Sequence, residues 1–110
     1  MKFWVDDLRP APEGFVRCKS VNEAKSKIIM VENRNKRYPK MNEKYEIEVI
    51  SLDHDAGDFS YAGGDYIKLL DWLEKTNRNY PIHIHSMNVV GVENMRRIIR
   101  KNGWKEIYKL

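Results

Sequence analysis

Apolar residues in this chain occur in two patterns that alternate along the sequence. Short apolar runs between polar residues are typical of β-strands, whereas apolar residues three or four positions apart are typical of one helix face. The runs predict five strands, near residues 2–6, 15–19, 49–52, 82–86 and 104–110. The helical spacing predicts three helices, which begin near Ser20, Gly63 and Asn88.

The first predicted helix has a clear start signal. Ser20 and Glu23 have the spacing of a capping box, in which each side chain accepts a hydrogen bond from a free backbone amide. The helix has one apolar stripe, made of Val21, Ala24, Ile28 and Val31. We expect this helix to end near Asn33.

The other two helices also show an apolar face and end signals. Gly63-Gly64-Asp65 opens the second helix, and residues 77–81 end it. The third helix has Asn88 as its N-cap and Gly103 as its C-terminal cap. The core positions of the two helices are Tyr66, Leu69, Leu70 and Leu73, then Val92, Met95, Ile98 and Ile99. No regular helix is expected over residues 8–14, because two prolines and a glycine interrupt that segment.

The alternation of strands and helices predicts a single α/β domain over residues 1–110. We expect a five-stranded, mostly parallel sheet covered by helices in a three-layer arrangement. Right-handed crossovers leave few strand orders, and the commonest one in small domains of this kind is 2-1-3-4-5. In that order strands 1, 3 and 4 are neighbours, so their carboxyl ends meet at one edge, where open α/β sheets bind ligands.

Composition narrows the class of protein. At 110 residues the chain has room for one hydrophobic core but not for two. Its hydrophobic content of 42% is typical of a soluble globular protein, and no apolar run approaches the roughly 18 residues of a membrane span. We expect no signal peptide, because the first residues run directly into a strand. The single cysteine, Cys18, excludes an internal disulfide and indicates a reducing cytoplasm, with a buried structural thiol favoured over a nucleophile.

Much of the formal net charge of +4 lies between Asn33 and Glu46. The basic residues of this connector are Arg34, Lys36, Arg37, Lys40 and Lys44. It could attract a nucleotide or RNA, but a solvated connector is the better interpretation, because it lacks the dense aromatic interleaving of a single-strand binding platform.

Three predicted strands end in side chains that are costly to desolvate. These side chains are Asp6-Asp7 after the first strand, Asp53-His54-Asp55 after the third, and His85-Ser86 at the end of the fourth. Buried carboxylates and imidazoles need a cation, a proton or one another. Because the three strand ends meet at one edge, the sequence predicts one site there.

The residue types at these ends indicate two kinds of chemistry. Asp6, Asp7 and Asp53 are suited to Mg²⁺ or Mn²⁺, which prefer carboxylates and water, unless they only cap backbone amides. His54 or His85 could move a proton, since histidine changes charge near neutral pH, unless each is structural. Without a cation, Asp53 and Asp55 would be candidates for direct acid–base chemistry.

Three further residues are candidates for binding a phosphate. Arg9 could clamp it with two hydrogen bonds, or form a salt bridge to Asp6 or Asp7. Ser86 could bind a phosphoryl oxygen, which is favoured over a nucleophilic role beside His85. Asn88 begins a helix whose free amides form an anion site, although it could act only as a cap. The remaining polar or aromatic candidates, His83, Trp4 and Trp72, are interpreted as core residues.

Three spaced motifs resemble a known family. They are Trp4-Val5-Asp6-Asp7-Leu8-Arg9-Pro10-Ala11-Pro12-Glu13-Gly14, then Ser51-Leu52-Asp53-His54-Asp55, then His85-Ser86-Met87-Asn88 with Gly91 and Asn94-Met95. In this order they resemble the cyclic-phosphate-processing receiver-like domains, catalytic relatives of two-component receivers. The resemblance implies a flavodoxin-like receiver fold, here without the final helix. It also implies action on cyclic phosphates, such as those on RNA ends or ADP-ribose derivatives, in nucleic-acid repair or conflict with phages.

The receiver parallel assigns roles to individual residues. Asp6 and Asp7 match the metal-binding acidic pair, Asp53 matches the phosphoacceptor, and Ser86 matches the switch hydroxyl. The chain departs from receivers in lacking a lysine in a loop after the last strand, and from the cyclic-phosphate family in having Val89 where a proline is expected.

Two classes of function are consistent with these residues. The first is a phosphoesterase, metal-assisted, that opens a cyclic phosphate or cleaves a small nucleotide phosphodiester, with His54 or His85 moving the proton. The second is a non-catalytic module that is phosphorylated on Asp53 or binds a nucleotide. A weaker third reading is RNA binding through the basic connector, which salt would weaken steeply.

Overall fold

The computed structural model describes residues 1–40 and 45–110. Along the chain the regular elements are β1 (Lys2–Val5), β2 (Phe15–Cys18), α1 (Val21–Arg37), β3 (Val49–Leu52), the 3₁₀ turn η1 (Gly57–Phe59), α2 (Ile67–Lys75), β4 (Ile82–Ile84) and α3 (Val89–Asn102). Between β1 and β2 the proline-containing segment forms no helix, as predicted.

The strands form one parallel sheet in the order β2-β1-β3-β4. This order confirms the predicted adjacency of strands 1, 3 and 4. The predicted fifth strand is wrong, because the segment after Trp104 makes only one parallel bridge, between Ile82 and Glu106. β4 has three residues, so it offers a short edge, and beyond the bridge Tyr108 and Leu110 are exposed.

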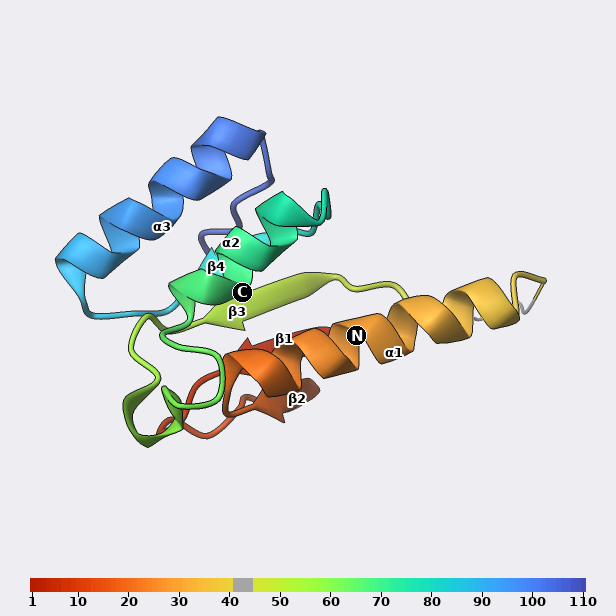
Figure 1. Cartoon of the computed structure of the whole chain (residues 1–110), viewed down its shortest axis with the longest axis horizontal. Coiled ribbons are helices and arrows are strands. Elements are labelled where there is room, and N and C mark those ends of the chain that lie inside the picture. The colour runs from red at the N-terminus through yellow and green to blue at the C-terminus, as the bar shows by residue number, and fades with distance from the viewer. Residues whose placement is uncertain (41–44) are drawn as a thin grey trace.

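All the helices of the described residues cover the same face of the sheet, so the predicted three-layer arrangement is wrong. Figure 1 shows α1 and α2 passing in front of the strands. The two crossovers that contain helices, β2 to β3 and β3 to β4, step in the same direction across the sheet, so right-handed connections place both helices on one side. The buried cluster accordingly includes Phe3, Val5 and Ile50 but not their strand neighbours Trp4 and Val49, which face the other side.

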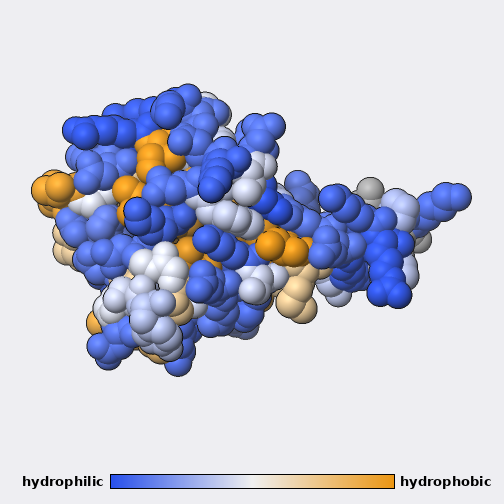
Figure 2. Space-filling model, in the orientation of Figure 1, coloured by the Kyte–Doolittle hydropathy of each residue, from blue (hydrophilic) through white to orange (hydrophobic). Residues whose placement is uncertain are grey.

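Helix α1 begins as predicted and continues further than predicted. The Ser20 hydroxyl accepts a hydrogen bond from the Glu23 amide, and the stripe of four apolar residues is buried. The helix ends at Arg37 instead of Asn33, since its last turn contains residues that favour helices. Its basic end projects beyond the sheet, as the blue arm in Figure 2 shows. Of the basic connector, Glu43 and Lys44 lie outside the described residues.

Helices α2 and α3 pack against each other over the sheet. α2 starts at Ile67, later than predicted, because the Asp65 carboxylate caps the Ala56 amide instead of the helix. α3 has the predicted caps, with Asn88 accepting from the Gly91 amide and Gly103 at a φ of 67°. Val92 is half-buried and not in the core, because it faces a surface cavity.

Two residues assigned to the core differ in their surroundings. Cys18 is fully buried, as predicted, and burial raises the pKa of its thiol to about 12. Trp72 is half-buried, with the Arg78 guanidinium 4.3 Å from its ring centroid.

None of the helices in residues 1–40 and 45–110 has the length and apolar composition of a membrane span.

Candidate active site

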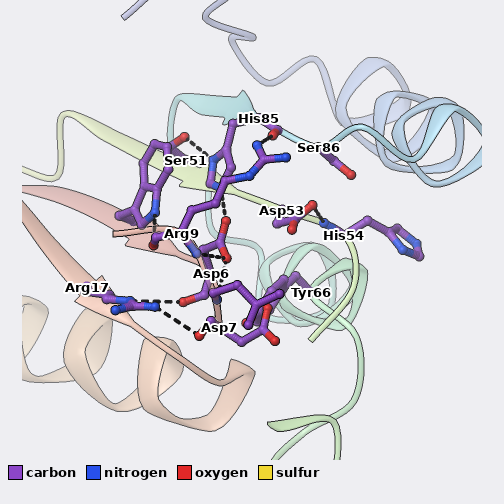
Figure 3. A network of polar contacts seen from close by, with 12 residues as sticks. Asp6, Asp7, Arg9, Arg17, Ser51, Asp53, His54, Tyr66, His85 and Ser86 are labelled. Atoms are coloured by element: carbon purple, nitrogen blue, oxygen red, sulfur yellow. Dashed lines mark hydrogen bonds and ion pairs between the residues drawn. The ribbon is translucent and has the colours of Figure 1, made fainter. Parts of the chain in front are cut away.

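The carboxyl ends of β1, β3 and β4 bring the predicted site residues to one edge of the sheet. Val5 pairs with Leu52, and Leu52 pairs with Ile84, so the residues that follow these strands are neighbours. Figure 3 shows the side chains of Asp6, Asp7 and Asp53 directed towards a common space. We call these three residues the acidic cluster. One carboxylate oxygen from each lies within 4.8 Å of the others.

Asp6 is the buried member of the acidic cluster, with no exposed surface. Its Oδ1 accepts hydrogen bonds from the amides of Leu8 (2.8 Å) and Arg9 (3.0 Å), and its Oδ2 lies 2.8 Å from His85 Nε2. Burial alone would raise the pKa of Asp6, but the two amides and the His85 ring bring it below its ordinary value. Asp6 is therefore a buried carboxylate that stays ionised.

Asp7 has the opposite electrostatic character. Burial raises its pKa, and the negative charges of Asp6, Asp53 and Asp58 raise it further. Gly57 leaves room for this side chain, because a Cβ at position 57 would lie 2.4 Å from Asp7 Oδ2. Gly57 also has a φ of +53°, which disfavours other residues.

The acidic cluster fits a divalent cation of the magnesium type. It offers carboxylate oxygens, which Mg²⁺ and Mn²⁺ prefer, and among the described residues Asp53 accepts one hydrogen bond, at Oδ1 from the His54 amide. Three carboxylates this close repel one another, and the charges of Asp6 and Asp53 add to the effect of burial on the pKa of Asp7. A cation would remove that repulsion. Asp6, Asp7 and Asp53 are thus the residues that could hold a metal.

His85 is fixed on every side. Its Nε2 is bonded to Asp6, its Nδ1 lies 2.8 Å from Ser51 Oγ, and its ring stacks on Trp4 with centroids 3.7 Å apart. Its side chain is 7% exposed. Neither ring nitrogen is therefore open to a substrate, and in Figure 3 the side chain lies above Asp6, joined to its carboxylate by a dashed line.

His54 has one free nitrogen. Its Nδ1 lies 2.9 Å from Asp55 Oδ1, and its Nε2 has no hydrogen-bond partner among the described residues. The ring lies against Gly91, where a Cβ would come within 2.5 Å of it. The hydrogen bond from His54 lowers the pKa of Asp55, and a hydrogen bond from the Asn88 side-chain amide lowers it further. In Figure 3 the ring projects from the far side of Asp53, away from Asp6.

Ser86 and Asn88 lie at the start of α3, next to His54. The Ser86 hydroxyl accepts a hydrogen bond from the Asn88 amide, while the Asn88 side chain caps α3 and reaches Asp55. A cavity of about 290 Å³ adjoins Ser86. It is lined by Ile84, Ser86, Met87, Val89, Val92, Glu93 and Arg96. The start of α3 thus offers polar groups and a recess with both polar and apolar surface.

Arg9 is not directed at the acidic cluster. Its guanidinium donates to the carbonyl oxygen of His85 (2.7 Å), and among the described residues it forms no ion pair with Asp6 or Asp7. Phosphate binding by Arg9 stays a prediction. Arg17 similarly donates to the carbonyl oxygens of Asp6 and Asp7. Both arginines hold the main chain at the strand ends, where several carbonyl groups have no strand partner.

The sequence interpretation missed several contributors to the site. Ser51 was taken only as part of a strand, although a serine within the run Val49–Leu52 is a polar residue in a buried element. His83, interpreted as buried, is half-buried and lies 2.7 Å from Ser51 Oγ. A second group of possible ligands, His54, Asp55 and Asp65, also lies within 4.8 Å. In this group Asp55 accepts a hydrogen bond from His54, and Asp65 accepts one from the Ala56 amide. Both carboxylates therefore have partners without a cation.

Comparison with known proteins agrees with this geometry. The model of one family, described as the cyclic-phosphate processing receiver domain, matches residues 1–101. No curated protein matches the chain. No solved structure matches it either. The match covers the acidic cluster, His54 and all four strands, and so the chain belongs to the cyclic-phosphate processing receiver domain family.

Proposed function

We propose that this protein is a metal-assisted phosphoesterase that opens a cyclic phosphate or cleaves a small nucleotide phosphodiester. The observation that carries the proposal is the acidic cluster beside a histidine with a free nitrogen, at the ligand-binding edge of the sheet. The family description supplies the substrate class, a cyclic phosphate. A cyclic-phosphate-bearing nucleotide or RNA end, met in nucleic-acid repair or phage–host conflict, is the substrate we propose.

The acidic cluster is the electrostatic half of the proposed site. Asp6, Asp7 and Asp53 would hold Mg²⁺ or Mn²⁺, and a cation bound there would neutralise charge that develops on the phosphoryl oxygens. Asp6 is prepared for this role because it is ionised and fixed before a cation arrives.

His54 is the proton-transfer half of the proposed site. Asp55 accepts from Nδ1, so a neutral His54 carries its lone pair on Nε2, the nitrogen without a protein partner. That nitrogen can take a proton from the attacking water, and the resulting imidazolium can return it to the leaving oxygen. Asp55 orients the ring and stabilises its charged form. We assign this role to His54 in preference to His85, whose nitrogens are both bonded.

The start of α3 would hold the rest of the substrate. The Ser86 hydroxyl and the first amides of α3 can donate to phosphoryl oxygens, because a helix N-terminus favours anions. The recess next to Ser86 offers apolar surface to the non-phosphate part of the substrate. Asn88 contributes by fixing this turn and the position of Asp55.

Turnover assays on cyclic substrates test the proposal. The substrates are a 2′,3′-cyclic nucleotide, an RNA oligonucleotide with a 2′,3′-cyclic phosphate end and an ADP-ribose cyclic phosphate, each with Mg²⁺ and Mn²⁺. His54→Ala should lower turnover by about 10²–10⁴ while much of the binding remains. Asp53→Asn should weaken Mg²⁺ binding in calorimetry with an unchanged circular dichroism spectrum. Ser26→Ala, at an exposed position on α1, serves as the control.

The alternative is a binding or signalling module. It gains support from the match between Asp6, Asp7 and Asp53 and the acidic pocket of receivers. Tight binding of one substrate without turnover, or stoichiometric labelling of Asp53 by a phosphoryl donor, would replace the enzyme proposal with this one.

A further inference from the structure

A chain of hydrogen bonds leads from the acidic cluster into the sheet. It runs from Asp6 Oδ2 to His85 Nε2 (2.8 Å), from His85 Nδ1 to Ser51 Oγ (2.8 Å), and from Ser51 Oγ to His83 Nδ1 (2.7 Å). Ser51 and His83 are partners in neighbouring strands, so their side chains lie on the same face. This is the face that no helix covers in the described part of the chain.

This chain of hydrogen bonds joins a serine, a histidine and an aspartate, the residue types of a catalytic triad, but Ser51 is not a nucleophile. Ser51 has no exposed surface, so a substrate cannot reach its hydroxyl. Its hydrogen bonds to two imidazoles account for its burial, since a buried hydroxyl without partners would be destabilising. The arrangement therefore acts on Asp6 and not on a substrate.

The direction of each hydrogen bond follows from the ionised carboxylate. A carboxylate oxygen only accepts, so His85 Nε2 carries a hydrogen and donates it to Asp6. In a neutral His85 ring Nδ1 then accepts, so the Ser51 hydroxyl donates to it and accepts from His83 Nδ1. Trp4 holds the ring plane, because the two rings are stacked with an angle of 2°.

These bonds leave Asp6 with a single free position. A carboxylate has about four lone pairs. The amides of Leu8 and Arg9 occupy Oδ1, and His85 occupies one side of Oδ2. The remaining lone pair is on Oδ2, the oxygen whose direction His85 fixes. Misplacing His85 would thus misplace the one ligand atom that Asp6 can offer to a cation.

We propose that Ser51 and His83 are positioning residues of the metal site, which orient His85 so that its Nε2 hydrogen holds Asp6 in a metal-binding geometry. This inference rests on the metal site in the proposed function. It assigns His85 to the same positioning role and removes it from proton transfer with the substrate. Partners behind a metal ligand commonly change metal affinity by about 10- to 100-fold when they are removed.

The conservative variant His85→Gln separates positioning from proton transfer. A glutamine side-chain amide can donate from nearly the same place as Nε2, but it cannot act as an acid or base near neutral pH. His85→Ala should weaken Mg²⁺ binding by roughly 10- to 100-fold in calorimetry. His85→Gln should recover most of the affinity and of the turnover. If His85→Gln binds Mg²⁺ normally but has no more turnover than His85→Ala, His85 transfers protons and the proposal is overturned.

Ser51→Ala directly tests the hydrogen bonds that Ser51 makes to His85 and His83. ¹⁵N spectra of the metal-free protein should show His85 as the Nε2–H tautomer, and the variant should show a mixture of tautomers. Its Mg²⁺ affinity should fall roughly two- to tenfold, the effect of losing one hydrogen bond. If Ser51→Ala does not fold, His83→Ala removes only the outer donor and should shift the same signals. Unchanged signals and affinity in the folded variant overturn the proposal.

The outcomes distinguish this inference from the proposed function. Wild-type protein that binds Mg²⁺ but hydrolyses no cyclic phosphate refutes the phosphoesterase, while the variants' affinities still decide the positioning role. Normal turnover with unchanged affinities refutes the positioning role alone. The absence of Mg²⁺ binding by the wild-type protein refutes both. Ser26→Ala, which removes an exposed hydroxyl, should leave affinity and spectra unchanged.

Discussion

A methyl group at position 91 would meet the ring of His54. A Cβ built on Gly91 lies 2.5 Å from His54 Cγ, 2.6 Å from its Cδ2 and 3.0 Å from Asn88 Cγ. Unstrained carbon contacts are about 3.5 Å or longer, so the Gly91→Ala change has to move the ring by about 1 Å. The Asn88 side chain caps α3, which leaves the ring as the group that moves.

The size of the effect differs between activity and stability. A displacement of about 1 Å in a catalytic group can lower turnover by about 10². Alanine in place of glycine within a helix stabilises by about 1 kcal/mol, while overpacking costs about 1–3 kcal/mol. The His54 side chain is 15% exposed, so it can turn towards solvent and relieve most of the overpacking. We therefore expect a large loss of turnover with a change in unfolding free energy of about 1 kcal/mol or less.

A double-mutant cycle with His54→Ala measures whether the effect acts through that ring. In the His54→Ala background Gly91→Ala should cause no further loss of turnover, because the displaced group is already absent. In the same background it should raise the urea midpoint, since the helix gain of about 1 kcal/mol remains and the two shortest contacts, both with the His54 ring, are gone. Wild-type turnover in Gly91→Ala, or an equal loss in both backgrounds, would refute the assignment of His54 to the site.

Three further outcomes follow from individual contacts. Gly57→Ala should weaken Mg²⁺ binding in calorimetry, because its Cβ meets a carboxylate of the acidic cluster, whereas Gly14→Ala, also at positive φ but meeting no atom, should not. Native Cys18, with a pKa of about 12, should resist a thiol reagent at about pH 8 and react fully once unfolded; labelling of the native protein would contradict its burial. Glu32→Gln should lose about 1–2 kcal/mol of unfolding free energy at neutral pH, because hydrogen bonds from Arg78 lower the pKa of Glu32. That stability is present above the ordinary value of 4.5 and disappears as pH falls through the lowered value, so urea melts of the two proteins should converge only below pH 4.5.

The strand order could be predicted because local patterns and topology rules agree. Apolar runs ending in Asp6, Asp53 and His85 marked the strand ends, and right-handed crossovers fixed their adjacency. Ser20, Asn88 and Gly103 marked the helix ends, because caps satisfy backbone groups locally. Signals of this kind depend on a few neighbouring residues.

The errors concern properties that no local pattern contains. The segment from Trp104 contains aromatic and β-branched residues that are typical of strands, but its pairing depends on the length of the β4 edge. The layer count depends on which connections contain helices, and the β1–β2 connection contains none. The role of His85, which stays a prediction, also depends on more than a local pattern, because the sequence shows only that His85 stands at a strand end. Its direction is set by Trp4 and Ser51, which are distant in sequence.

The position of β1 and β3 inside the sheet has a consequence for amide hydrogen exchange. These two strands have neighbours on both sides, so their amides exchange mainly when the whole domain unfolds. Asp6 and Asp53 directly follow them, whereas Asp55 and the start of α3 lie in connections that can open locally. We expect slow exchange beneath the acidic cluster and faster exchange around Asp55 and Ser86. The acidic cluster would then keep its position during local fluctuations that displace and restore Asp55 and the start of α3.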